Sequence, residues 1–332
     1  MEMPYNDIIR KFIDMYAGRL RNQVSFMLSA CNFYMPIFEE ALDAYGLPLE
    51  LRYLPIIESA LNPSAVSRAG ASGLWQFMIG TGKIYGLESN SLVDERRDPI
   101  KATWAAARYL KEMYDIYGDW NLVIAAYNCG PGTINKAIRR ANGETDYWKI
   151  YNYLPKETRG YVPAFIAANY VMTYYCDHNI CPMETNIPAS TDTVQVNKNL
   201  HFEQIADLCN LPLDQIKSLN PQYKKQMIPG SSKPYTLRLP IDAISTFIDK
   251  QDTIYAHRAD ELFRNRKTVA VKEVTPTTRR QTSAVAGKGK LTYYKIKSGD
   301  TLSSIAEKLG VRVKIYSSGT VCRTPESQQE NN

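Results

Sequence analysis

The sequence predicts an α+β protein in which a mainly α domain precedes small βααβ modules. Residues up to about 180 carry apolar side chains at three-to-four-residue spacing, which is typical of amphipathic helices, and no period-two run of strand length. After Pro182 the pattern changes to strand, helix, helix, strand within about 50 residues. The chain has 332 residues, 44% of them hydrophobic, so it is long enough for two or three domains with at least one sizeable core.

The first part of the mainly α domain is helical by pattern. Segment 1–35 carries apolar residues at helical spacing and predicts one or two amphipathic helices. Pro48 suits the first turn of a further helix, because proline lacks the N–H group that a first turn leaves unpaired. Pro55 cannot donate to the hydrogen-bond ladder of that helix, so it predicts a kink just before Glu58. Such a kink would present the Glu58 carboxylate at a cleft.

Capping residues mark the predicted starts and ends of helices in the second half of this domain. Asp98 followed by Pro99 predicts a helix start, since a capping side chain precedes proline at the first helical position, and Gly118 predicts the end of that helix. Asp119 predicts the start of the next helix, which Gly130 ends. Two further helices are predicted over residues 133–141 and about 156–175.

The C-terminal part contains an internal repeat. Residues 193–196 and 235–239 predict strands, and apolar stripes over 202–209 and 213–219 predict two helices between them. The pattern recurs from Tyr293 but breaks off before a second helix and a closing strand. The predicted organisation is an N-terminal amphipathic helical segment (1–35), a mainly α domain (36–182), a first module (190–241), a basic flexible linker (242–290), and an incomplete module with a polar tail (291–332).

The excess of positive charge is local. Forty basic and thirty-four acidic residues leave a net charge of +6, and basic residues gather between 258 and 297. A stretch of this kind could bind nucleic acid, anionic lipid or an acidic cell-wall polymer, but a solvated basic linker is the commoner explanation, so we expect no nucleic-acid partner. The six cysteines form no CxxC pair and only three histidines are present. We therefore expect no metal site and no cofactor.

Targeting signals are not visible in the sequence. The N-terminus lacks a basic region followed by an apolar one, and no run of about 18 apolar residues occurs. These patterns lead us to expect either a cytosolic chain or one whose export signal has been removed or omitted.

Glu58 is the residue that most directly suggests chemistry. It lies in the apolar run 54–60, shortly before the glycine-rich stretch 69–76. An acid held among apolar side chains keeps its proton to higher pH, because desolvation disfavours the charged form. A proton donor near neutrality is what cleavage of a glycosidic bond needs. A glutamate in an apolar helix is more often a partnered or edge residue, so the hypothesis depends on the order of the residues around it.

Three ordered motifs around Glu58 closely resemble the signature of the family 1 lytic transglycosylases. The first covers residues 58–82, with ESALNP followed by AVSRAGASGLWQFM and GTG. The second is AYNCGPG at 126–132, and the third is ETRGYV at 157–162. The resemblance spans about residues 36–180.

Two further features place the resemblance within that family. Trp75 and Cys129 stand where many relatives have Met and Ala, and they point to the membrane-bound lytic murein transglycosylase D branch. SGDTL at 298–302 looks like the opening of a LysM module. The first module has KNLH at 198–201 instead of that opening, so a role in binding sugar and a purely structural role both stay open for it.

The resemblance implies a goose-lysozyme-like fold and a reaction. The implied reaction is cleavage of the β-1,4 bond between N-acetylmuramic acid and N-acetylglucosamine, with Glu58 as the single acid/base and a 1,6-anhydro product. The implied partner is peptidoglycan, the implied location is the periplasm or cell envelope, and we expect a monomer, with membrane association left open. By resemblance, the substrate-binding residues are Ser67, Gln76, Met78, Tyr127, Asn128 and Tyr161.

Two alternatives stay open on the sequence. A hydrolytic muramidase would cut the same bond with water and would need a second carboxylate. Asp94, Glu95 and Asp98 are the nearest in sequence, although each also fits a loop or cap role. A non-catalytic peptidoglycan-binding protein would keep the fold for attachment alone.

Overall fold

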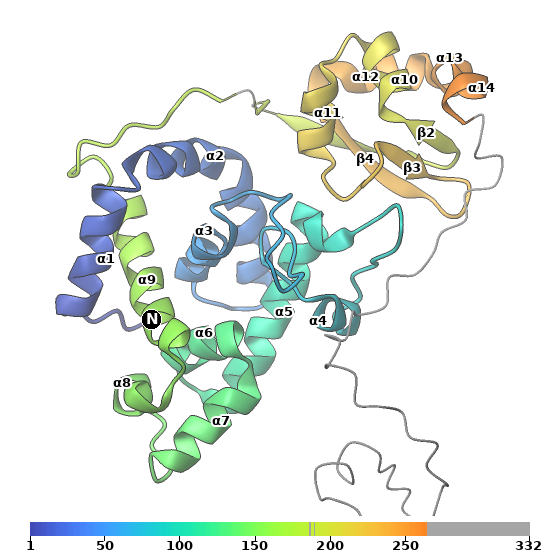
Figure 1. Cartoon of the computed structure of the whole chain (residues 1–332). Helices are drawn as coiled ribbons and strands as arrows, with labels where there is room; N and C mark the ends of the chain where they lie inside the picture. The colour runs from blue at the N-terminus through green and yellow to red at the C-terminus, as the bar shows by residue number, and fades with distance from the viewer. Residues whose placement is uncertain (186, 189, 264–332) are drawn as a thin grey trace, which may run out of the picture. The chain divides into compact units, whose positions relative to one another are not determined.

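The computed structural model describes residues 1–185, 187–188 and 190–263 (Figure 1). These residues belong to one compact unit, Met1–Pro276. The expected incomplete module at 291–332, and the expected linker from residue 264 onward, lie outside the described residues. Within the described ranges, no helix combines the length and the apolar character needed to cross a membrane.

The N-terminal part of the chain is helical, as predicted. Its elements, labelled in Figure 1, are α1 (Asp7–Ala17), α2 (Arg21–Ala44), η1 (Leu49–Tyr53), α3 (Leu54–Ser59), α4 (Ile79–Ile84), η2 (Glu95–Arg97), α5 (Pro99–Tyr117), α6 (Trp120–Cys129), α7 (Pro131–Arg140), α8 (Tyr147–Ile150), η3 (Tyr151–Tyr153) and α9 (Lys156–Thr173). The short elements α4, α8, η2 and η3 were not predicted, because three to six residues carry too little periodicity to detect.

The predicted caps of two long helices are confirmed. The Asp98 carboxylate accepts hydrogen bonds at 3.0 Å from the backbone N–H groups of Ile100 and Lys101 at the start of α5. Gly118 ends α5 in the left-handed conformation with a φ of 61°. Asp119 accepts from the N–H of Leu122 at 2.7 Å and starts α6. These side chains satisfy donors that a helix terminus leaves without partners.

Pro55 acts differently from the prediction. It does not kink one continuous helix; instead the 3₁₀ helix η1 ends at Tyr53, and α3 begins at Leu54 with Pro55 in its first turn. Proline is tolerated there because a first-turn N–H has no partner within the helix. The change of helix type redirects the chain four residues before Glu58.

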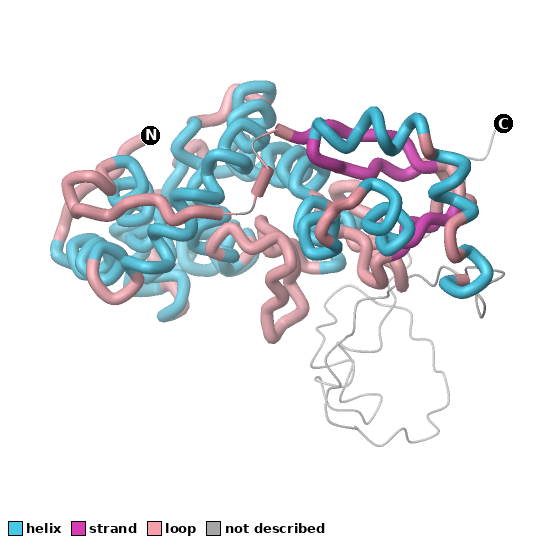
Figure 2. Tube along the Cα trace, turned by 90° about the horizontal axis from the view of Figure 1, so that it is seen from above, coloured by secondary structure: helices cyan, strands magenta, loops and turns pink. Residues whose placement is uncertain are grey.

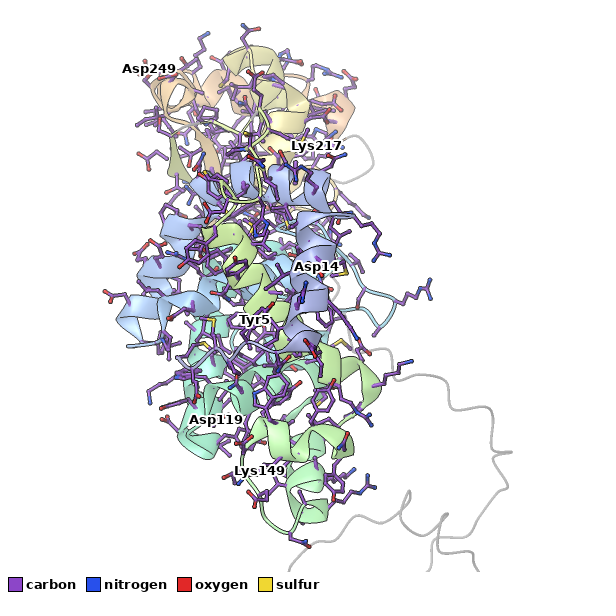
Figure 3. The ribbon with its side chains drawn as sticks, turned by 90° about the vertical axis from the view of Figure 1, so that its left-hand side faces the viewer. Tyr5, Asp14, Asp119, Lys149, Lys217 and Asp249 are labelled. Atoms are coloured by element: carbon purple, nitrogen blue, oxygen red, sulfur yellow. The ribbon has the colours of Figure 1, made fainter. Side chains whose placement is uncertain are left out.

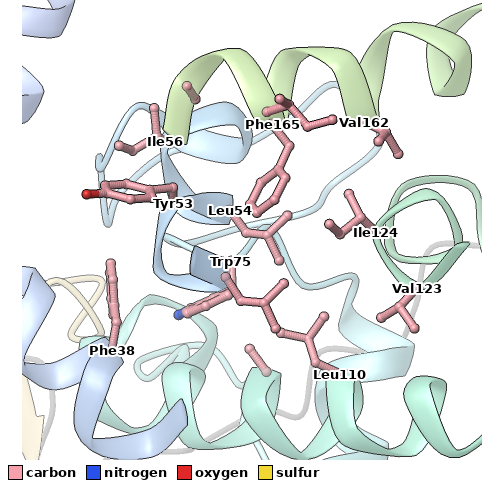
Figure 4. Close-up of a cluster of buried hydrophobic side chains, with 14 of the residues drawn as sticks. Phe38, Tyr53, Leu54, Ile56, Trp75, Leu110, Val123, Ile124, Val162 and Phe165 are labelled. Carbon is pink, nitrogen blue, oxygen red and sulfur yellow. The ribbon is translucent and has the colours of Figure 1, made fainter. Parts of the chain in front are cut away.

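Helix α3 is held inside the helical part by packing. It lies against α9, which also packs on α1 and α6, while α5 packs on α2 and α6. Trp75 is fully buried in this core, with its ring edge-on to Phe38 at 5.4 Å between centroids (Figure 4). Its indole N–H donates to the hydroxyl of the buried Thr103 at 2.9 Å, which satisfies the polar end of the ring.

Charged side chains lie on the outside of these helices. Asp14 on α1, Lys149 on α8 and Asp249 near the C-terminal end of the described chain are exposed and point outward (Figure 3). The division between apolar interior and charged exterior is the one that amphipathic periodicity predicts.

The first module has the predicted order of strand, helix, helix, strand (Figure 2). Strand β1 (Thr191–Val196) pairs antiparallel with β4 (Tyr235–Pro240), and between them lie α10 (Phe202–Cys209) and α11 (Leu213–Leu219). A second antiparallel pair joins β2 (Asn199–His201) to β3 (Met227–Pro229). The second pair was not predicted, because strands of three residues are too short to show a period of two.

The prediction of a flexible linker from residue 242 is wrong for its first part. The chain forms α12 (Ile241–Asp249), α13 (Gln251–Ala256) and α14 (Ala259–Leu262). Phe247 and Ile254 are fully buried in the same hydrophobic cluster as Phe202 of α10. Burial of these apolar side chains favours a helix here. The polar and charged residues around them in the sequence made that helix hard to predict.

Substitution Phe247→Ala tests the place of α12 in the core of the module. We expect it to lower the free energy of unfolding by about 3 kcal/mol, because removal of a fully buried ring leaves a cavity. Ile248→Ala, at a side chain that is 56% exposed on the same helix, should cost less than about 1 kcal/mol. Urea unfolding of the full chain followed by circular dichroism measures both, and equal effects would contradict the burial of α12.

Candidate active site

Glu58 lies in the last turn of α3, where the chain turns sharply. Ala60 and Leu61 follow it in the left-handed region, with φ values of 50° and 59°. Residues with a side chain adopt this conformation at a cost, and such residues concentrate at functional sites. The Ser59 hydroxyl lies within hydrogen-bond distance of two carbonyl oxygens, that of Pro55 at 3.0 Å and that of Leu74 at 2.9 Å. The end of α3 is therefore fastened to the glycine-rich loop.

The Glu58 carboxyl is a weak acid because of its surroundings. Burial raises its pKa to about 7, although part of the side chain still reaches the surface. The hydroxyl of Tyr161, on α9, donates a hydrogen bond to Glu58 Oε1 and opposes this rise by stabilising the carboxylate. The negative charge of Glu157 adds to the rise. At neutral pH both protonation states are well populated, so the group can donate and accept a proton.

Two tyrosines on different helices face the Glu58 carboxyl. Burial raises the pKa of Tyr127 and of Tyr161 well above the usual value, and the charge of Glu58 adds to the rise in both. Both phenols therefore stay protonated and act as hydrogen-bond donors. Tyr127, on α6, donates to the carbonyl oxygen of Trp75 at 2.7 Å. The tertiary structure thus gathers Glu58, Tyr127 and Tyr161 from α3, α6 and α9.

Asn128, next to Tyr127, is held by Thr158 of α9, a residue to which the sequence assigned no role. Its side-chain oxygen accepts from the hydroxyl of Thr158 at 2.9 Å. Thr158 is almost fully buried on α9, one turn before Tyr161. The bond orients the Asn128 amide and leaves its N–H groups available. Thr158 and Glu157 belong to the third motif, and their spacing from Tyr161 on one helix was the signal that could have identified them.

The other predicted substrate-binding residues lie on the loop between α3 and α4. Ser67 accepts from the N–H of Ala71 at 3.0 Å and shapes a turn. The Gln76 side-chain amide donates to the Gly73 carbonyl oxygen at 2.8 Å, and Gln76 itself has a φ of 48°. Met78, immediately before α4, is 45% exposed. These contacts are internal to the loop, so contact of the three residues with substrate stays a prediction.

The three carboxylates considered for a hydrolytic site have structural partners. Asp94 forms a buried ion pair with Arg96, with 2.8 Å between Oδ2 and Nη2. Glu95 accepts from the N–H of Glu88 at 2.8 Å and pairs with Lys101, and Asp98 caps α5. In the part of the chain that is described, no three or more His, Cys, Asp or Glu side chains form a group that could hold a metal ion.

Comparison with known families identifies the helical domain. Residues 35–150 match the family model described as the Transglycosylase SLT domain. Residues 190–256 match the lytic transglycosylase MltD LysM-like domain, and residues 294–315 match the LysM domain. The chain is 31% identical over 320 residues, 95% of its length, to the membrane-bound lytic murein transglycosylase D of Escherichia coli (strain K12). The chain therefore carries a match to the Transglycosylase SLT domain, followed by matches to two LysM-type domains.

The resemblance drawn from the motifs, and the fold class of an SLT domain followed by LysM-type modules, are thereby confirmed. The chain spans 65% of the length of that curated relative. A shorter match joins the SLT domain to the soluble lytic murein transglycosylase of Escherichia coli (strain K12), with 33% identity over 36% of this chain and 19% of that one. The crystal structure of the 70 kDa soluble lytic transglycosylase from Escherichia coli is 29% identical over 43% of this chain and 24% of that chain, with a TM-score of 0.38.

Substitution Tyr161→Phe tests the hydrogen bond that holds Glu58. Because this bond lowers the pKa of the carboxyl, its loss should move that pKa above 7. Titration of the ¹³C-labelled carboxyl by NMR measures the change directly. Tyr127→Phe is the matched control, since the Tyr127 hydroxyl donates to the Trp75 carbonyl oxygen and not to Glu58. A larger rise in the control would contradict the assignment.

The raised pKa of Glu58 also predicts how stability depends on pH. The folded protein holds this proton up to about pH 7, whereas the unfolded chain releases it near 4.5, so stability is lost as pH rises through this interval. Glu58→Gln removes the ionisation and should stabilise the fold by about 3 kcal/mol at pH 8, with no difference near pH 4.

Glu40→Gln is the control for this experiment, because it changes an exposed glutamate on α2. Thermal or urea unfolding at several pH values gives the comparison. A stabilisation of Glu58→Gln that does not depend on pH would contradict burial as the origin of the raised pKa.

Proposed function

We propose that this SLT-domain protein is a peptidoglycan lytic transglycosylase that cleaves the MurNAc-β-1,4-GlcNAc bond without water. The observation that carries the proposal is the Glu58 carboxyl, with a pKa of about 7 and a hydrogen bond from Tyr161. The names of the curated relatives, lytic murein transglycosylases, support the same reaction. We place the activity in the cell envelope, where peptidoglycan lies.

The first step is protonation of the leaving group. Protonated Glu58 transfers its proton to the glycosidic oxygen as the C1–O bond of N-acetylmuramic acid breaks, and positive charge develops at C1 and the ring oxygen. The Glu58 carboxylate left behind stabilises that charge. Tyr161 remains protonated and continues to donate to this carboxylate, which favours completion of the transfer.

The second step uses the same carboxylate as a base. Glu58 takes the proton from the C6 hydroxyl of the muramoyl residue, and O6 attacks C1 to close the 1,6-anhydro ring. Attack within one sugar gains from a high effective molarity and needs no activated water. One carboxyl group with a pKa near 7 is therefore sufficient for both steps, whereas inverting and most retaining hydrolases need two carboxyl groups.

The substrate-binding roles follow from the available polar groups. We assign Asn128, oriented by Thr158, and the loop residues Ser67 and Gln76 to acetamido and hydroxyl groups of the glycan. The exposed side chain of Met78 and the ring of Tyr127 offer apolar surface to sugar rings. LysM-type modules after the SLT domain would hold the enzyme on its polymer and raise the local concentration of substrate.

Hydrolysis of the same bond is the second candidate, and one observation favours it. Glu157 is exposed, and it is a carboxylate whose charge acts on Glu58. A water held between two carboxylates would make a muramidase of this site. Asp94, Glu95 and Asp98 have other partners, so the alternative now depends on Glu157.

Digestion of peptidoglycan followed by mass spectrometry tests the proposal. We expect muramoyl products lighter by one water than the products of hydrolysis. Glu58→Gln should lower turnover at least about 10³-fold, because the amide cannot transfer a proton, while binding to the insoluble polymer is retained. Glu157→Gln should retain anhydro products. Reducing-end products from the wild type would refute the transglycosylase, and full activity of Glu58→Gln would refute Glu58 as the acid.

A further inference from the structure

A segment of the SLT domain forms part of the fold of the first LysM-like module. The backbone N–H of Asp94 donates to the carbonyl oxygen of Gln222 at 2.8 Å, and the N–H of Lys224 donates to the carbonyl oxygen of Leu92 at 2.8 Å. Between these bonds, Val93 and Tyr223 form an antiparallel bridge. The segment thus pairs with the module through one isolated β-bridge.

The side chains of this segment complete the apolar core of the module. Val93 is fully buried and Leu92 is 4% exposed, and both belong to the cluster that contains Phe202 and Leu237 of the module. Without the module, these two side chains would face water. A module that only tethers the enzyme to its polymer needs no such shared core.

Polar contacts surround the shared core. The Glu88 carboxylate accepts from the hydroxyl of Tyr235 at 3.0 Å and pairs with Lys233 at 2.7 Å. The ammonium group of Lys224 donates to the carbonyl oxygen of Asn90 at 2.7 Å and lies 3.7 Å from the Asp94 carboxylate. The positive charge of Lys224, a residue of the module, therefore lies next to the carboxylate of Asp94, which is 1% exposed.

Asp94 links Lys224 to the loop beside the active site, through Arg96. Its two oxygens accept from Nε and Nη2 of Arg96, which is 5% exposed. Burial acts to raise the pKa of Asp94, but the hydrogen bonds and charge of Arg96, with the charge of Lys224, outweigh it and hold that pKa below its usual value. Nη1 of Arg96 donates to the carbonyl oxygens of Gly70 and Phe77, at 2.8 and 2.9 Å. One guanidinium thus clamps both ends of the glycine-rich loop.

The backbone of the loop lies directly on this clamp. A Cβ atom added at Gly73 would meet the carbonyl oxygen of Arg96 at 1.8 Å, so only glycine fits there. The next two residues carry the carbonyl oxygens that accept from the active site: Leu74 from Ser59, beside Glu58, and Trp75 from Tyr127. A shift of the loop therefore reaches the catalytic helix.

We propose that the first LysM-like module helps to fix the geometry of the active site. In this proposal Lys224, Asp94 and Arg96 are positioning residues that hold the loop at 65–77. This inference rests on the proposed transglycosylase function for its catalytic consequence. The docking itself is independent of that function. Loss of the Lys224 contact should loosen the loop and slow the chemical step without weakening attachment to the polymer.

Substitution Lys224→Met, in the full chain, is the test. It keeps the length of the side chain and removes its charge and its bond to Asn90. We expect amide hydrogen exchange of the loop at 65–77 to become about tenfold faster. On peptidoglycan, kcat should fall on the order of tenfold while KM stays within about twofold, because misplacement of the loop affects chemistry more than binding.

Two variants serve as controls. Lys225→Met removes the neighbouring exposed charge and should change neither exchange nor kcat. Lys224→Arg restores a cation and should recover most of the loss, which general damage to the fold would not do.

Three results would overturn the proposal. They are unchanged loop exchange in Lys224→Met, faster exchange with unchanged kcat, and a rise in KM alone, which would indicate a tether. If the wild type releases no anhydro product, the proposed function fails, and the exchange measurement still decides whether the module holds the loop.

Discussion

The proposed chemistry of this protein depends on one desolvated carboxyl group, that of Glu58. Burial of Glu58 would leave a proton that is hard to release, and the hydrogen bond from Tyr161 returns its pKa to about 7, where donation and acceptance are both accessible. The two partners are 103 positions apart in the chain and come from α3 and α9. Packing of these helices around Phe165 and Leu54 therefore sets the acid strength of the site as well as its shape (Figure 4).

A second buried ionic group holds the glycine-rich loop beside the site. Arg96 satisfies its guanidinium with the Asp94 carboxylate and with two carbonyl oxygens of the loop, as a buried cation must. Lys224 extends the group into the LysM-like module. The SLT domain and the module thus share both an apolar core, through Val93, and an ionic group. Through these contacts, we propose, the module holds the loop beside the active site. A module that only attached the protein to its polymer would not need them.

Much of the local structure could be predicted from the sequence. The caps at Asp98 and Asp119 were correct, because a short polar side chain before a helix satisfies its own backbone neighbours. The strands β1 and β4 and the helices between them were also predicted from periodicity. The helices α12 and α13 were missed, because Phe247 and Ile254 are helical through burial against residues about 40 to 50 positions away, such as Phe202 and Ile205. Thr158 was missed for a related reason, since its role depends on Asn128 of another helix.

By itself, the sequence determined the fold class, most of the long helices, the resemblance to a family and the identity of the candidate acid. Periodicity, capping and ordered motifs act over short distances and are written in neighbouring residues. Only the tertiary structure decided what Glu58 can do, which partners Asp94 and Glu95 have, and how the module meets the loop. A pKa near 7 is the balance of desolvation against one hydrogen bond from a distant helix. Neither quantity exists until the chain has folded.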